Sequence, residues 1–247
     1  MDPPLTELAF KHGTDKHREG KSADTCTHRT TTFHFGPFRH REINVLEIGV
    51  GGFEDPKAGG ESLRMWKEYF TKAQIVSLDY YDKTALQEDR IRIYRGSQDD
   101  PALLKRMHEE CGGSDIIVDD GSHCCDHVIT SFKILFPLLR SGGIYAVEDL
   151  ETSYWKVTGG SSTDLNATTS SMGFFKSLLD GLNYKEFEIP EYQPTYFDEH
   201  IVSMTFYHNL VIVYKGENDE ESNVMVGNQM PEALAALYPK FDWLNAT

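Results

Sequence analysis

The stretch INVLEIGVGG, residues 43–52, decides the fold. A short apolar run ends in a cluster of glycines, as a buried strand does when it turns into a loop at a ligand site. Comparable runs follow at residues 73–79, 114–120 and 142–149, and RIRIYRG (90–96) predicts a further strand. Because these runs are continuous instead of alternating, we expect strands that are covered on both faces.

Amphipathic stretches with helical spacing separate these strands. They are SLRMWKEYF (62–70), PALLKRMHEEC (101–111) and HVITSFKILFPLLR (127–140), and they assign Trp66, Phe132 and Leu135 to the core. Alternation of strands and helices predicts an α/β fold with a doubly wound, mostly parallel sheet. The stretch HIVSMTFYHNLVIVYKG (200–216) predicts a C-terminal antiparallel hairpin that turns at His208 and Asn209. Two further helices are expected over 174–182 and 231–241.

We expect one large domain over residues 41–247, preceded by an N-terminal segment, 1–40, that covers the cofactor and substrate. Within the domain, the stretch near 151–173 is rich in Gly, Ser and Thr and too long for an ordinary connection. It is therefore expected to form a substrate loop.

Composition narrows the classes of partner. The formal net charge is -15, and no basic patch is visible, so a nucleic-acid partner is not expected. No apolar run approaches the roughly 18 residues of a membrane span, and the start of the chain lacks the regions of a signal peptide. We expect a cytoplasmic protein without a membrane partner, whose four cysteines are reduced.

The glycine-rich loop after residue 48 points to a cofactor, although a dinucleotide fits poorly. In the GxGxxG pattern, Gly49 and Gly51 would be the first two glycines, but position 54 is a glutamate instead of the third glycine. The acidic residue of that pattern lies about 20 residues after the first glycine, and Asp79 lies about ten residues further along the chain. A ligand with a ribose and a positive centre fits better. Asp79 can accept protons from the ribose hydroxyls, and Glu47 supplies negative potential near a sulfonium.

Two predicted strands end in acidic pairs, Asp119-Asp120 and Glu148-Asp149, and His123 follows the first pair. Carboxyl ends of neighbouring strands meet at one edge of the sheet, where three or four carboxylates repel one another. A hard divalent cation, with Mg²⁺ preferred, relieves that repulsion. The alternative is that Asp120 and Asp149 cap the helices that follow.

Glu47, Gly49, Gly51 and Asp79 resemble the S-adenosylmethionine site of class I methyltransferases. Four stretches together resemble the metal-dependent sugar O-methyltransferases of antibiotic biosynthesis, a group that includes macrocin, mycinamicin and nucleotide-rhamnose O-methyltransferases. These stretches are LEIGVGGFEDPKAGGESLRMW (46–66), IIVDDGSH (116–123), FPLLRSGGIYAVEDLETSYW (136–155) and SMGFFKSLLDGLN (171–183). The similarity runs from about HGTDK (12–16) to FYHNLVIVYKG (206–216).

The resemblance implies a magnesium ion on Asp120, Glu148 and Asp149, with His123 as the general base. It also implies contacts to the methyl donor, S-adenosylmethionine, from Thr14, Glu47, Gly49, Gly51, Ser62, Asp79, Gln98 and Asp119. The HGTDK stretch is expected to close over the carboxyl group of the donor through Thr14 or Lys16, although a helix-ending turn explains Gly13 equally well. Relatives are commonly oligomeric, so a homo-oligomer is expected.

The function implied is Mg²⁺-dependent transfer of a methyl group to a sugar hydroxyl of a glycosylated natural product or a nucleotide-linked sugar. Magnesium that binds two vicinal oxygens lowers the pKa of the hydroxyl, and a neutral imidazole takes its proton. One alternative is a cyclase or pericyclase that uses the same fold without methyl transfer. Another is a non-catalytic binding protein.

Overall fold

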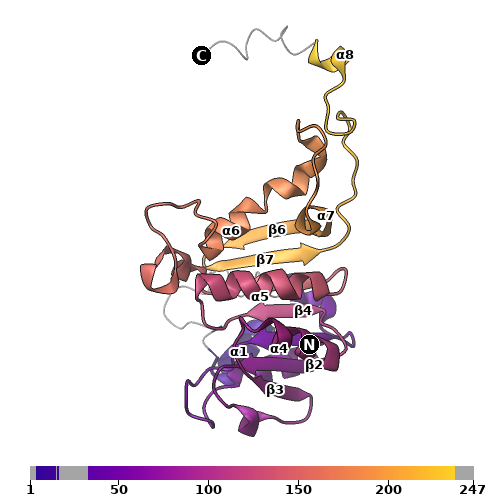
Figure 1. Ribbon diagram of the computed structural model, residues 1–247. Helices are drawn as coiled ribbons and strands as arrows, with labels where there is room; N and C mark the ends of the chain where they lie inside the picture. The colour runs from indigo at the N-terminus through magenta and orange to yellow at the C-terminus, as the bar shows by residue number, and fades with distance from the viewer. Residues whose placement is uncertain (1–3, 15, 17–32, 237–247) are drawn as a thin grey trace.

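The protein is built around one seven-stranded sheet (Figure 1). The computed structural model describes residues 4–14, 16 and 33–236. The strands lie in the order β3-β2-β1-β4-β5-β7-β6. Their bounds are β1 Asn44–Ile48, β2 Gln74–Asp79, β3 Ile91–Arg95, β4 Ile116–Asp119, β5 Ile144–Val147, β6 Ile201–Tyr207 and β7 Leu210–Lys215.

The predicted mostly parallel α/β sheet with an antiparallel hairpin is confirmed. Strands β1 to β5 pair in parallel, whereas β7 runs antiparallel to both β5 and β6. The chain moves outward from β1 to β3 and then returns to place β4 on the other side of β1. Ligands of doubly wound sheets bind where the strand order reverses, at the carboxyl ends of the strands, so the fold predicts a site beside β1 and β4.

Helices cover both faces of the sheet, and α5 crosses the face turned toward the viewer in Figure 1. One core lies beneath α1 and α3, and the other lies beneath α4, α5 and α6. The α-helices are α1 Leu5–His12, α3 Glu61–Tyr69, α4 Pro101–Glu110, α5 Cys125–Leu138, α6 Ser171–Ser177, α7 Tyr196–His200 and α8 Glu232–Ala235. The 3-10 helices are η1 Gly36–Phe38, η2 Thr84–Leu86, η3 Leu150–Tyr154, η4 Lys156–Thr158 and η5 Asp180–Glu186.

The predicted core residues Trp66, Phe132 and Leu135 are buried, and the hairpin turns at Asn209, which has a φ of 60°. The helix expected over 174–182 is instead divided between α6 and η5. Helices α1 and α7 were not predicted; α7 has only five residues, whereas Leu5, Leu8 and Ala9 of α1 have helical spacing and were a usable signal. Of the helix expected over 231–241, α8 is the part that lies within the described residues.

Two features of the described residues concern membrane spans and cysteines. None of its helices combines the length and the apolar character needed to cross a bilayer. Cys111, Cys124 and Cys125 are free thiols in the structure, and Cys26 lies outside the described residues.

Candidate functional site

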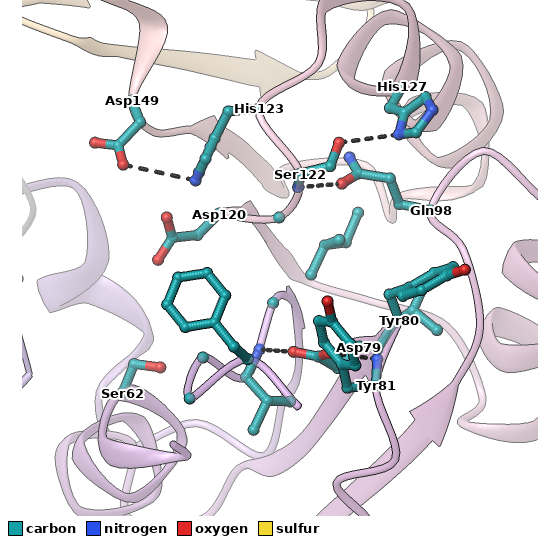
Figure 2. A pocket seen from close by; sticks show the side chains of 18 of the residues that line it. Ser62, Asp79, Tyr80, Tyr81, Gln98, Asp120, Ser122, His123, His127 and Asp149 are labelled. Carbon is teal, nitrogen blue, oxygen red and sulfur yellow. Dashed lines mark hydrogen bonds and ion pairs between the residues drawn. The ribbon is translucent and has the colours of Figure 1, made fainter. Parts of the chain in front are cut away.

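A cavity of about 860 Å³ lies beyond the carboxyl ends of the central strands (Figure 2). Its volume is within the range of small-molecule sites. Most of the predicted site residues line it: Thr14, Gly49, Gly51, Ser62, Asp79, Gln98, Asp120, His123 and Asp149. The predicted residues Glu47, Asp119 and Glu148 are not among the lining residues.

Gly49 explains how the loops after β1 and β4 come together. Its φ is +102°, which favours glycine, and its amide N–H donates to the Leu78 carbonyl at 2.8 Å. A Cβ at this position would lie 2.1 Å from the backbone oxygen of Asp120. Any side chain here would therefore separate the two loops that carry the site.

Asp79 organises one end of the cavity. Its Oδ2 accepts a hydrogen bond from the Val50 amide at 2.9 Å, and its Oδ1 accepts one from the Tyr81 amide at 2.8 Å. Each carboxylate oxygen keeps a second lone pair for a ligand hydroxyl. Tyr80 and Tyr81 also line this end, and both are exposed. The sequence interpretation missed both tyrosines, although an aromatic pair directly after a strand end was a usable signal.

The structure corrects the placement of Asp119. Its carboxylate points away from the cavity into the core beneath α5, where it accepts hydrogen bonds from Ser131 Oγ at 2.6 Å and Gln98 Nε2 at 3.0 Å. Burial raises the pKa of Asp119 to about 6, although these two hydrogen bonds act in the opposite direction. Gln98 lines the cavity and uses its Oε1 to accept the Ser122 amide at 2.7 Å. Asp119 therefore holds Gln98 in place instead of reaching the cavity itself.

Asp120, His123 and Asp149 gather at the other end of the cavity, as Figure 2 shows. His123 Nε2 lies 3.7 Å from Asp149 Oδ2, too far for a hydrogen bond. His123 and Asp149 both have positive φ, 55° and 53°, and such backbone strain in residues other than glycine is concentrated at functional sites.

These three side chains can hold a metal ion. One ligand atom from each of Asp120, His123 and Asp149 lies within 4.8 Å of the others. The predicted ligand set included Glu148 in place of His123. A nitrogen that ligates a metal cannot accept a proton, so the two roles of His123, ligand and base, exclude each other at one nitrogen.

Glu148 instead pairs with a lysine that the sequence interpretation had assigned to the donor. Lys16 Nζ lies 2.9 Å from Glu148 Oε1, 2.9 Å from Asp120 Oδ2 and 3.3 Å from Glu47 Oε1. Glu47 is fully buried, and its Oε2 accepts a hydrogen bond from Ser62 Oγ at 2.8 Å. Ser62, which lines the cavity, thus connects the buried carboxylate to it.

The charges of this cluster are incompletely balanced. Burial and the neighbouring carboxylates raise the pKa of Glu148 to about 8, whereas Lys16 acts in the opposite direction. Burial likewise raises the pKa of Glu47, against the effect of Lys16. Burial alone would lower the pKa of Lys16, but the three carboxylates together raise it well above its usual value. One ammonium faces three carboxylates here, so the surplus of negative charge suits a divalent cation.

Comparisons with known proteins agree with this geometry. The chain is 45% identical over 188 residues to the mycinamicin VI 2''-O-methyltransferase of Micromonospora griseorubida, covering 76% of this chain and 47% of the relative. It is 42% identical over 223 residues to the 8-demethyl-8-alpha-L-rhamnosyl tetracenomycin-C 2'-O-methyltransferase of Streptomyces olivaceus, covering 90% and 57%. No family model matches the chain.

Among solved structures, the chain is similar to the MycE methyltransferase of the mycinamycin biosynthetic pathway in complex with Mg and SAH. The TM-score is 0.86 at 38% identity, over 98% of this chain and 60% of that one. A MycE complex that also contains mycinamycin VI matches with a TM-score of 0.80 at 40% identity, over 90% and 57%.

The chain spans about half the length of the curated relatives it matches. The matched part nevertheless includes most of this chain and the whole sheet arrangement. The chain is a homologue of the sugar O-methyltransferases of antibiotic pathways and has the class I S-adenosylmethionine-dependent methyltransferase fold.

Proposed function

We propose that the protein transfers a methyl group from S-adenosylmethionine to a sugar hydroxyl of a glycosylated natural product, with a divalent metal ion, Mg²⁺, as cofactor. One observation carries the proposal: a single cavity joins the Asp79 end, suited to a ribose, to the acidic end that contains His123. Both reactants can therefore meet within this one cavity, and holding them in line supplies much of the rate. The relatives that methylate rhamnosyl or macrolide-linked sugars support this acceptor class.

For the donor, Asp79 offers carboxylate lone pairs, and Thr14 lies at the cavity wall. Glu47 is screened by Ser62, so we assign it an electrostatic effect on the sulfonium instead of direct contact. Asp119 does not contact the donor either; it accepts a hydrogen bond from Gln98 and thereby positions that side chain, which lines the cavity.

At the acceptor end, Nε2 of His123 accepts the proton of the attacking hydroxyl. Asp149 Oδ2, at 3.7 Å from that nitrogen, stabilises the imidazolium that results. When bound, Mg²⁺ would supply positive charge beside the acceptor, which would lower the pKa of the attacking hydroxyl. Asp120 and Asp149 would hold the metal, because their ligand atoms lie within 4.8 Å of each other, and Glu148, which pairs with Lys16, stays a proposed further ligand.

The test uses labelled S-adenosylmethionine with mycinamicin VI and rhamnosylated tetracenomycin as candidate acceptors. Product mass should rise by one methylene, and chelator should abolish the transfer until Mg²⁺ is restored. Undiminished transfer in excess chelator would contradict the role of the metal. Turnover of an acceptor without a gain in mass would instead favour a cyclase, the alternative that the relatives do not favour.

The localisation, the oligomeric state and the range of partners stay predictions from the sequence. We propose a cytoplasmic enzyme that works as a homo-oligomer on a small sugar-bearing substrate, without nucleic-acid or membrane partners. A nucleotide-linked sugar remains the second acceptor class to test. Gel filtration with light scattering measures the assembly.

A further inference from the structure

Lys16 has an unusual environment for a lysine. Its side chain is only 8% exposed, and its ammonium contacts the carboxylates of Glu47, Asp120 and Glu148. Each carboxylate comes from a different strand end, those of β1, β4 and β5. Burying an ammonium costs several kcal/mol unless it is paired, so this arrangement requires all of its partners to be well placed.

Alternation along the strands explains why the three carboxylates converge. Side chains two positions apart on a strand share a face. The apolar residues two positions before each carboxylate belong to the core beneath α1 and α3: Val45, Val118 and Ala146. Glu47, Asp120 and Glu148 therefore point toward the face that α1 covers. Helix α1 ends at Gly13, and Lys16 follows on that same face.

Lys16 contacts only one oxygen of each of two carboxylates. Lys16 pairs with Oδ2 of Asp120 and with Oε1 of Glu148. The second oxygen of each carboxylate can turn toward a cation, as ligating carboxylates do when an outer partner holds their first oxygen. Glu47 Oε1, which no hydrogen bond reaches, faces Lys16 at 3.3 Å. Lys16 thus carries the counter-charge for Glu47, and it contacts one oxygen each of Asp120, which lines the cavity, and of Glu148, which does not.

The same lysine also connects the N-terminal segment to the cavity. Thr14, two residues before it, lines the cavity, and the Lys16 amide donates to Thr14 Oγ1 at 3.3 Å. Lys11 pairs with Glu68 near the end of α1, and the ion pairs of Lys16 are a second, buried charged attachment of this segment.

We propose that Lys16 is a positioning residue: it orients Asp120 and Glu148 for the divalent cation and holds Thr14 at the donor cavity. The proposal rests on the proposed function for the identity of the cation. An alternative role for Lys16 is to compete with the ion for the same carboxylates. In that case loss of the lysine would tighten metal binding, whereas a positioning role predicts weaker binding.

Calorimetric titration with Mg²⁺ in the presence of S-adenosylhomocysteine tests the first part. K16M should weaken Mg²⁺ binding by about 10- to 100-fold, the usual effect of removing a partner that orients metal ligands. K16R keeps the charge and should stay closer to the wild type than K16M does. K11M is the matched control, because Lys11 is an exposed lysine of the same segment that pairs with Glu68. Unchanged or tighter Mg²⁺ binding in K16M would overturn the proposal.

Hydrogen exchange in the absence of metal tests the second part. The amides of Thr14 and Lys16 should exchange about tenfold faster in K16M than in the wild type or K11M, since K16M loses buried ion pairs whereas the Lys11 pair is exposed. Equal exchange would overturn this part. If the wild type itself binds no Mg²⁺, the metal role in the proposed function and the first part both fail, while the exchange rates still decide whether Lys16 holds the segment.

Discussion

Replacing Asp79 by asparagine tests the donor end of the cavity most directly. The Asp79 carboxylate accepts two backbone N–H groups, from Val50 and Tyr81, and keeps a lone pair on each oxygen. Asparagine offers only one oxygen, so one loop loses its acceptor and the ligand loses a charged partner. The loss of one hydrogen bond to a charged group costs about 1.5–3 kcal/mol. The dissociation constant for S-adenosylhomocysteine should therefore rise about 10- to 150-fold.

Isothermal titration with S-adenosylhomocysteine measures this change, and thermal unfolding monitors the fold. Asp82→Asn is the matched control: Asp82 is an exposed aspartate three residues later, its partner is Thr84, and it does not line the cavity. Affinity in D79N within about twofold of D82N would refute the assignment of Asp79 to the donor, since one hydrogen bond to a charged group is worth at least tenfold.

Three further predictions concern other parts of the chain. His123→Ala should lower kcat by about 100- to 10,000-fold with unchanged S-adenosylhomocysteine affinity, in a methyl-transfer assay in which His127→Ala loses much less. Lys83 is fully buried and donates to the Asp55 and Ala58 carbonyls at 2.6 and 3.0 Å, so Lys83→Met should lower the free energy of unfolding in urea by about 1–3 kcal/mol, whereas the exposed Lys57→Met should not. Burial lowers the pKa of His34, so the folded state favours neutral imidazole, and stability should fall as the pH drops below about 6.5; equal pH dependence in His34→Gln would contradict this.

Much of the fold was predictable because it depends on local patterns. Short apolar runs bounded by turn residues, such as the one before Gly49, predict buried strands, and the amphipathic stretches between them predict helices that cover the sheet. The acidic residues at strand ends were predictable for the same reason: parallel strands bring their carboxyl ends to one edge. Alternation could also have separated Asp119 from Asp120, because adjacent residues of a strand face opposite sides.

The sequence by itself therefore determined the sheet, the glycine-rich loop and the presence of an acidic edge. Only the tertiary structure decided which charges meet there. Lys16 and Asp120 are 104 positions apart, and no periodicity links a short N-terminal segment to a strand end. Their contact depends on where α1 packs, which is decided by burial of apolar side chains over the whole molecule.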